Sequence, residues 1–263
     1  MRKIFFACTI IVMGLSGCKK GDLNLFSIED DKTLGQQTVS QILADPQQYP
    51  ILSQSQYPQQ YAYLEAMKNE ILNSGKVRYK NEFEWKLYII NDPNTQNAFC
   101  TPGGYIFVYT GLMKYLDNAS SLAGVMGHEM GHTDRRHSTT QMTKQYGLQT
   151  LLDIVLGNNQ NALTQVAASL VNLQFSRDDE KDADAQSVTY LCPTAYRADG
   201  AADFFIKIEN SGGSQVPAFL STHPNPDKRV TNIQTKKSEL GCSNVPGNTK
   251  EITDYLQFRS SLP

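Results

Sequence analysis

The stretch that most constrains the fold of this chain is Gly127-His128-Glu129-Met130-Gly131-His132. On an α-helix, His128 and His132 lie four residues apart and therefore share one face, one turn apart. Two imidazoles placed in this way can both bind one zinc ion, which accepts neutral imidazole nitrogen and keeps an open position in catalytic sites. Glu129 lies about 100° further round the helix. Its carboxylate cannot join the two histidines as a ligand, but it can reach a water on the metal and accept its proton as a general base.

The residues before this motif indicate that its helix is buried. The segment from Ser120 to Met126 begins with serine and continues with small and apolar side chains. Two buried histidines beside a buried glutamate would be unfavourable without an ion, because buried polar groups need partners. The alternative interpretation is a solvated helix face that carries two histidines. We expect a helix from Ser120 to about Arg136 that binds one zinc ion per chain.

An acidic stretch further along the chain, from Phe175 to Ala185, contains a candidate third zinc ligand. Ser176 is a good N-cap, and the acidic residues behind it fill the first helical turn, where the helix dipole favours negative charge. Glu180 and Asp184 share one face of this helix at a spacing of four residues. We expect Glu180 to complete a His-His-Glu zinc site and Asp184 to accept the other N–H of a ligating imidazole. The alternative is a solvated acidic face.

The other two of the four histidines have different expected roles. His223 precedes a proline, so its backbone is held extended in a loop. Three roles stay open for it: stabilising the oxyanion that grows on an attacked carbonyl, occupying the open zinc position as a fourth ligand at rest, or serving as a structural turn residue. His137 lies five residues after His132, about 140° away on a helix. We therefore exclude it as a ligand of the same zinc and expect it at the surface or at a helix end.

The N-terminus carries the pattern of a bacterial export signal. Arg2 and Lys3 precede an apolar stretch, Ile4 to Leu15, that is too short to span a bilayer comfortably. Leu15-Ser16-Gly17-Cys18 resembles the lipobox of bacterial lipoproteins. This resemblance implies a signal peptide over residues 1–17 and a lipid on Cys18. The alternative is an ordinary signal peptide with a stray cysteine.

The segment after the lipobox reads as a tether. Lys19 follows the cysteine in place of aspartate, which by the same resemblance favours the outer over the inner membrane. We expect a polar tether over residues 18–31 and a folded domain over residues 32–263. The only later apolar candidate for a membrane span, Leu148 to Leu173, is interrupted by Gly157-Asn158-Asn159-Gln160-Asn161. The expected protein is therefore lipid-anchored in the envelope.

Charge and cysteine content limit the partners. The net charge is −2 and no basic stripe is present, so no nucleic-acid partner is expected. An exported chain can form disulfides. Cys192 and Cys242 both lie at ends of expected helices and are the preferred pair, with Cys100 packed as a small apolar residue. Three reduced, buried thiols are the alternative.

Periodicity predicts a mostly helical chain with a small sheet before the motif helix. Expected helices, besides the two described above, are Thr33 to Tyr49, Gln59 to Asn73, Leu112 to Leu116, two within Ser138 to Gln174, Thr194 to Asn210 and a terminal helix from Asp227 to Leu240. Expected strands are Phe83 to Ile90 and Tyr105 to Tyr109, with Phe99 in a hairpin around Pro102-Gly103-Gly104. This hairpin either presents an edge to an extended peptide or is an ordinary structural element.

These motifs, taken in order, resemble the HtpX/CAAX-prenyl-endopeptidase family of gluzincins. The resemblance rests on the His-Glu-Met-Gly-His motif, Glu180 with Asp184, Thr222-His223-Pro224 with Arg229, and the strand region from Asn97 to Leu112. Within this family, the chain is similar to the soluble BepA-like envelope branch, because it has a lipobox and no expected membrane helices. The resemblance implies an α+β zincin-like fold and endopeptidase activity. It also implies that Arg229 orders the loop or the carboxylates of the site, and that Asn97 and Ala98 lie along the substrate backbone.

The expected function is a lipid-anchored zinc endopeptidase that cleaves misfolded or misassembled proteins of the bacterial envelope. The alternative from another class is a chaperone-like binding module with an occluded zinc site. The intact Glu129 favours the enzyme, because a structural site does not require a base.

Overall fold

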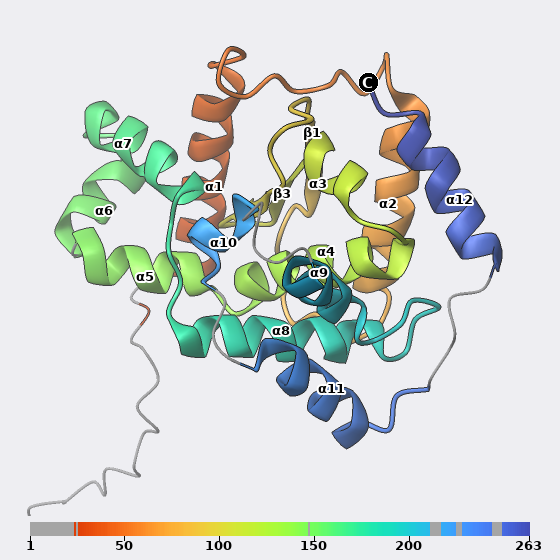
Figure 1. Cartoon of the computed structure of the whole chain (residues 1–263). Coiled ribbons are helices and arrows are strands. Elements are labelled where there is room, and N and C mark those ends of the chain that lie inside the picture. The colour runs from red at the N-terminus through yellow and green to blue at the C-terminus, as the bar shows by residue number, and fades with distance from the viewer. Residues whose placement is uncertain (1–23, 25, 147, 211–216, 225–227, 244–248) are drawn as a thin grey trace, which may run out of the picture.

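The computed structural model describes residues 24, 26–146, 148–210, 217–224, 228–243 and 249–263 (Figure 1). The expected signal peptide and Cys18 lie outside these residues. The described part contains twelve helices and three strands. In chain order they are α1 (Ile28–Leu43), α2 (Pro58–Leu72), β1 (Lys86–Ile90), β2 (Ala98–Thr101), β3 (Tyr105–Tyr109), α3 (Thr110–Tyr115), α4 (Ala119–Asp134), α5 (His137–Tyr146), α6 (Leu148–Val155), α7 (Gln160–Val171), α8 (Arg177–Leu191), α9 (Gly200–Asn210), α10 (Phe219–Thr222), α11 (Arg229–Glu239) and α12 (Thr249–Ser260).

The three strands form one sheet in the order β1-β3-β2. Strand β3 lies in the centre, parallel to β1 and antiparallel to β2. Gly103 and Gly104 turn the chain from β2 to β3 with φ of +78° and +92°, and a Cβ at Gly104 would lie 2.8 Å from the backbone nitrogen of Trp85. The predicted hairpin is confirmed, and β2 lies at an edge of the sheet.

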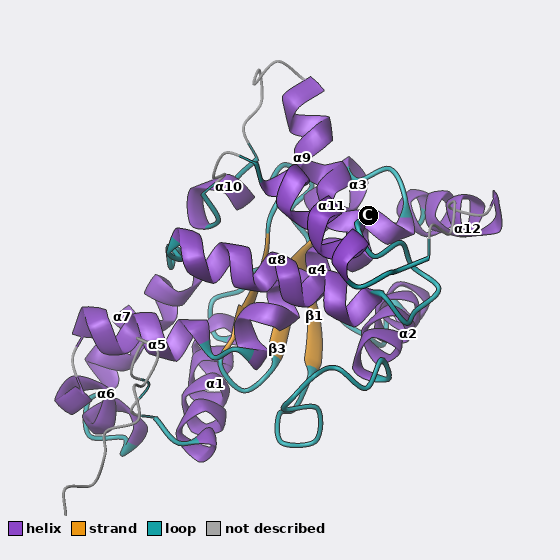
Figure 2. Cartoon of the chain, turned by 90° about the horizontal axis from the view of Figure 1, so that it is seen from below, coloured by secondary structure: helices purple, strands orange, loops and turns teal. Residues whose placement is uncertain are grey.

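The sheet is covered by helices on both faces, which explains why its strands are almost entirely buried. Alternate residues of the strands point to opposite sides. Phe99 and Phe107 pack with Val39 and Ile42 of α1, whereas Cys100 and Ile106 belong to the larger core that includes α4. Beyond α4 lie α8 and then α11 (Figures 1 and 2).

Helix α4 is central in this layered arrangement, and all of its residues are buried. Its N-cap is Asn118, whose side-chain oxygen accepts a hydrogen bond from the backbone N–H of Ser121 at 2.8 Å. Two glycines let neighbouring helices approach closely. A Cβ at Gly124 would lie 2.1 Å from the nitrogen of Ala201 in α9, and one at Gly127 would lie 2.9 Å from Oγ of Ser187 in α8. The motif helix is therefore packed tightly between the sheet, α8 and α9.

Several expected boundaries were wrong. The tether was expected to extend to residue 31, but Ser27 caps α1 in a capping box with Asp30, and Phe26 is buried. The folded part therefore begins before residue 32. Strand β1 begins at Lys86 rather than Phe83, because Trp85 has a positive φ of 45°.

The helices of the second half also differ from expectation. Three helices, not two, lie between α4 and α8. Helix α9 begins at Gly200, not at residue 194. Helix α11 is not terminal, because α12 follows it, with Tyr255 and Phe258 packed into the main core. In the described ranges no helix has both the length and the apolar character that a membrane span requires.

The cysteine prediction is confirmed. A disulfide joins Cys192, at the end of α8, to Cys242, just beyond α11. Cys100 is free and buried on β2, and burial raises the pKa of its thiol well above the usual value. This thiol stays protonated and packs as an apolar group.

Candidate metal centre

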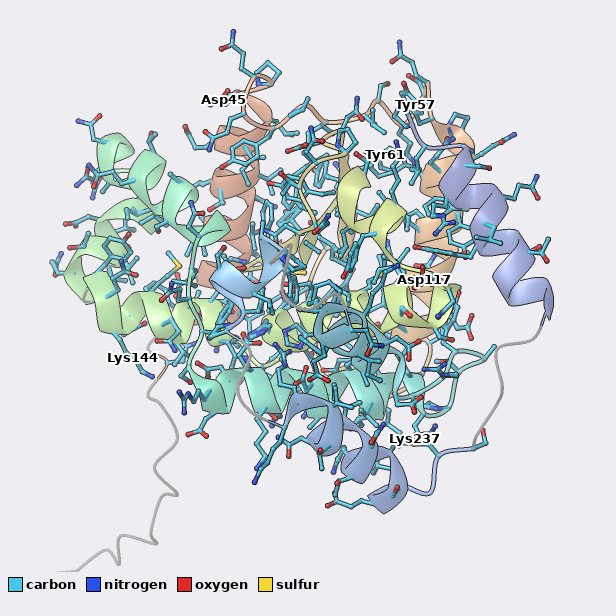
Figure 3. The ribbon with its side chains drawn as sticks, in the orientation of Figure 1. Asp45, Tyr57, Tyr61, Asp117, Lys144 and Lys237 are labelled. Atoms are coloured by element: carbon cyan, nitrogen blue, oxygen red, sulfur yellow. A yellow bond between two sulfur atoms is a disulfide. The ribbon has the colours of Figure 1, made fainter. Side chains whose placement is uncertain are left out.

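Four side chains from α4, α8 and the segment after α10 meet in the interior of the protein. They are His128, His132, Glu180 and His223, and one potential ligand atom from each lies within 4.8 Å of all the others. All four are at most 1% exposed. Charged side chains elsewhere mostly lie at the periphery, as Asp45, Lys144 and Lys237 do in Figure 3. Among the described residues, this is the one group of at least three histidine, cysteine or acidic side chains that is placed to hold a metal ion.

The spacing of the donor atoms fits a single ion. The Nε2 atoms of His128 and His132 lie 3.0 Å apart, and each lies 3.4 Å from an oxygen of Glu180. Zinc bonds of about 2.0–2.2 Å at tetrahedral angles require ligand atoms roughly 3.3 Å apart. Two imidazole nitrogens and a carboxylate oxygen are also a typical zinc donor set. The expected trio of ligands is thus brought together at the separation that zinc requires.

His223 completes the group. It ends the short helix α10, and its ring stacks on that of Phe219 with centroids 4.2 Å apart. Its Nδ1 lies 3.2 Å from Nε2 of His128 and 2.9 Å from a carboxylate oxygen of Glu180. Its Nε2 lies 3.3 Å from Oε1 of Glu129. This ring therefore touches both the expected ligands and the expected base, so it is not a remote turn residue.

Asp184 and Arg229 lie behind the ligands. Oδ1 of Asp184 is 2.8 Å from Nδ1 of His128, and Arg229 donates two hydrogen bonds to the same carboxylate, at 2.8 and 2.6 Å. Arg229 also lies 3.0 Å from an oxygen of Glu180, and its guanidinium covers the ring of Phe205 at 4.1 Å. A single buried cation thus contacts two buried carboxylates and offsets part of their negative charge.

These contacts set the charges of the site. Burial alone would raise the pKa of Asp184, but the charge of Arg229 and the hydrogen bond with His128 lower it below the usual value. Burial would likewise raise the pKa of Glu180, and the surrounding histidines lower it strongly. Both carboxylates are therefore ionised, as metal binding and imidazole orientation require.

Glu129 has the opposite environment. It is 1% exposed, and burial raises the pKa of its carboxyl above the usual value despite the nearby histidines. It follows His128 on α4, and its Oε1 lies 3.3 Å from Nε2 of His223. A carboxyl group whose pKa is raised in this way is a better proton acceptor than an exposed one.

Asn97 and Ala98 lie at the start of the edge strand β2, which packs on α4. Both are buried, and the side-chain oxygen of Asn97 accepts a hydrogen bond from the backbone N–H of Ala98 at 2.9 Å. The carbonyl of Gln96 accepts a hydrogen bond from the N–H of Phe219 at 3.0 Å. The segment that carries His223 is therefore attached to the start of this strand, next to the metal cluster.

One residue near the site, His137, makes contacts that the sequence did not indicate. His137 was excluded as a zinc ligand, and it does not belong to the four-residue cluster. It begins α5, as one expectation allowed, but it is buried and not at the surface. Arg136, with φ of +61°, reverses the chain after α4 and turns His137 back toward His132. An arginine gives no signal for a left-handed turn, so the sequence did not indicate this contact.

The fold and the metal cluster together define a metallopeptidase of the zincin type. A comparison with protein families gives a match to peptidase family M48 over residues 58–237. The chain belongs to peptidase family M48. The expected α+β zincin-like fold and the family resemblance found in the sequence are both confirmed.

Individual relatives agree with this assignment. The mitochondrial metalloendopeptidase OMA1 of Arabidopsis thaliana is 33% identical over 147 residues, which cover 55% of this chain and 30% of that protein. The beta-barrel assembly-enhancing protease of Yersinia pestis is 26% identical over 248 residues, or 88% of this chain and 48% of that protein. The metalloprotease YcaL of Escherichia coli is 25% identical over 189 residues, which cover 69% of this chain and 70% of that protein. The chain spans less than half of the length of the first two.

Proposed function

We propose that this metalloprotease is a zinc-dependent endopeptidase that cleaves misfolded or misassembled proteins of the bacterial envelope. The observation that carries the proposal is the convergence of His128, His132 and Glu180 within 4.8 Å of one another beside the buried Glu129. The printed name of the Yersinia relative, a beta-barrel assembly-enhancing protease, supports the envelope setting.

In this proposal His128, His132 and Glu180 hold the zinc ion. Zinc, when bound, polarises the carbonyl of the scissile peptide and makes water a stronger acid. Glu129 accepts the proton of the attacking water on its carboxylate and later delivers it to the nitrogen of the leaving amine. The raised pKa of Glu129 supports this exchange, because a carboxyl whose pKa is closer to neutral pH both accepts and releases a proton more readily there.

His223 has two roles in the proposal, one without and one with a bound peptide. In the described conformation its Nδ1 points at the ligand cluster, 3.2 Å from Nε2 of His128, which supports a fourth ligand at rest. A bound peptide must displace the ring from the cluster, and the displaced imidazole would donate a hydrogen bond to the oxyanion that forms on the attacked carbonyl. Asn97 and Ala98, at the adjoining edge strand, would then lie along the peptide backbone.

The burial of the cluster is also compatible with an alternative function, a binding module that does not cleave its partner. A peptide cannot reach side chains that are 1% exposed or less unless part of the structure moves. A chaperone-like binding module with an occluded zinc site would show the same burial. Glu129 separates the two functions, because only the peptidase needs a base beside the ion.

The cellular setting is also part of the proposal. We infer a signal peptide over residues 1–17, a lipid on Cys18 and an anchor in the outer membrane, facing the periplasm. The support is the lipobox sequence Leu15-Ser16-Gly17-Cys18. The peptidase domain would follow a tether that ends near Phe26, where the first buried apolar side chain of the described residues occurs.

Digestion of casein, with and without a chelator, tests the activity. We expect wild-type protein to cleave casein, the chelator to abolish cleavage, and added zinc to restore it. The binding-module alternative predicts no cleavage in any condition. Cleavage that persists in excess chelator would contradict a zinc-dependent mechanism.

A further inference from the structure

We propose that His137 is a positioning residue that fixes the ring of the metal ligand His132, through a hydrogen bond between two imidazoles. The two expected histidine ligands are supported in different ways. Nδ1 of His128 faces the carboxylate of Asp184, at 2.8 Å. Nδ1 of His132 faces Nδ1 of His137, at 3.0 Å. The inference rests on the proposed metal role of His132.

The proton positions follow from the chemistry of neutral imidazole, which carries one N–H. Nε2 of His132 faces the ligand cluster, 3.0 Å from Nε2 of His128, so a metal takes this nitrogen. The proton of His132 must then sit on Nδ1 and be donated. His137 must accept it on its own Nδ1, which leaves the proton of His137 on Nε2. With a metal on Nε2 of His132, the contact between two neutral imidazoles requires this pair of tautomers.

Two carboxylates of α8 favour the required tautomer of His137. Its Nε2 lies 3.4 Å from Oδ2 of Asp182 and 3.7 Å from Oδ1 of Asp179. Carboxylates accept hydrogen bonds and do not donate when ionised. They therefore stabilise a proton on Nε2 of His137 and leave Nδ1 free to accept from His132.

Each of these carboxylates is held by further contacts. Asp179 is part of the capping box of α8 with Ser176 and also accepts a hydrogen bond from Gln141 at 2.6 Å. Asp182 accepts hydrogen bonds from Arg135 at 2.6 Å and from Gln186 at 3.1 Å. The partners of His137 thus cannot turn away without losing other bonds.

The ring of His132 is also held from the side. The ring of Phe175 stacks on it with centroids 3.8 Å apart. Stacking fixes the plane of the imidazole, and the bond to His137 fixes its rotation within that plane. Helix α8 therefore acts on both histidines of α4: directly through Asp184, and through His137 by way of Asp179 and Asp182.

A polar cavity of about 480 Å3 borders this arrangement and is lined in part by His137, Asp179, Asp182 and Thr140. It offers a matched control. Thr140 lies on the same helix as His137 and lines the same cavity, but its hydroxyl donates to the carbonyl of Arg136 and not to a metal ligand. A change at Thr140 alters the cavity and leaves the imidazole pair intact.

The experiment measures zinc affinity by competition with a chromophoric chelator for wild-type protein, His137→Gln, His137→Leu and Thr140→Ala. A glutamine side chain offers a carbonyl oxygen as acceptor, whereas leucine offers none. We expect His137→Leu to bind zinc 10- to 100-fold more weakly, as is typical when such a supporting partner is lost. His137→Gln and Thr140→Ala should stay within about threefold of wild type.

Nitrogen-15 NMR of histidine-labelled, zinc-loaded wild type gives a second readout that depends on no variant. The protons are expected on Nδ1 of His132 and on Nε2 of His137. A proton on Nδ1 of His137, equal zinc affinity of wild type and His137→Leu, or equal weakening by glutamine and leucine would each overturn the positioning role. Failure of the wild type to bind zinc would instead overturn the proposed metal centre.

Discussion

Asp184 Oδ1 lies 2.8 Å from Nδ1 of His128, and these two residues of α8 and α4 stand 56 positions apart in the chain. The carboxylate is in turn bound by Arg229 of α11, which is 2% exposed. Three helices are therefore joined by one buried chain of charge-assisted hydrogen bonds that ends at His128, a proposed metal ligand. Such bonds are stronger than neutral ones and depend on every partner being present.

Removal of Arg229 should destabilise the protein strongly. In Arg229→Leu, the carboxylates of Asp184 and Glu180 would remain buried without their cation. Breaking a buried ion pair from one side typically costs about 3–5 kcal/mol of unfolding free energy. Arg229→Lys keeps the charge but loses the two-bond geometry, so its loss should be smaller. Urea denaturation in the presence of chelator measures both, and a leucine variant as stable as wild type would show that Arg229 does not balance these carboxylates.

Replacement of Glu129 should separate metal binding from catalysis. Glu129→Gln keeps the size of the side chain and removes the proton acceptor, while the expected ligands are unchanged. We expect zinc content equal to that of wild type and a loss of casein cleavage of at least about 100-fold, the lower range for general-base catalysis. Atomic absorption and the digest are run on the same sample. A variant that retains zinc and full activity would refute the role of Glu129 as base.

Loss of the disulfide should lower stability without removing the site. Cys192 and Cys242 are 50 positions apart, and closing a loop of this length stabilises a folded chain by up to about 4 kcal/mol. The double variant Cys192→Ala/Cys242→Ala is expected to unfold at lower urea concentration but still to bind zinc when folded. Treating wild type with a thiol reductant should reproduce the effect. Equal urea midpoints for the oxidised wild type and the double variant would contradict a stabilising role.

The two ion pairs of Asp199, which is not part of the metal cluster, predict a pH dependence. Asp199 lies 3.0 Å from Lys237 of α11, which is labelled in Figure 3, and 3.3 Å from Arg197. Burial alone would raise the pKa of Asp199, but its two cationic neighbours lower it below the usual value. A lowered pKa gives stability that is fully present above the unfolded-state pKa of about 3.9 and is lost as the pH falls through the folded-state pKa.

Asp199→Asn should therefore reduce the free energy of unfolding at pH 7 by about 1 kcal/mol. The difference from wild type should shrink as the pH falls below about 4, because the wild-type carboxylate becomes protonated first in the unfolded state and then, at lower pH, in the folded state. Urea denaturation of both proteins at pH 7 and at pH 3 measures this trend. A difference that is unchanged or larger at pH 3 would contradict the inferred pKa shift.

The sequence predicted each half of the metal cluster, because helical spacing determines which side chains share a face within one helix. His128 and His132 must share a helix face at a separation of four, and Glu180 and Asp184 follow the same rule on the second helix. Both spacings can be recognised in the sequence without the tertiary structure. The sequence could not show that α4 and α8 pack side by side, which depends on the close approach of α8 at Gly127 and Gly131 of α4.

Features set by tertiary contacts were missed or misread. The position of His137 depends on the left-handed backbone of Arg136, which is not an expected residue for that conformation. The early start of α1 had a signal, the capping box of Ser27 and Asp30, that was overlooked. Helix α12 has weak amphipathic character and is held through Tyr255 and Phe258 against distant helices, so local periodicity did not predict it.

The most direct test of the central claim is anomalous diffraction at the zinc absorption edge from crystals of the zinc-loaded protein. We expect one strong peak within about 2.0–2.2 Å of Nε2 of His128, Nε2 of His132 and a carboxylate oxygen of Glu180. If these three side chains contact one another directly and the anomalous peak lies elsewhere or does not occur, the proposed zinc centre is wrong, and the zinc-dependent mechanism fails with it.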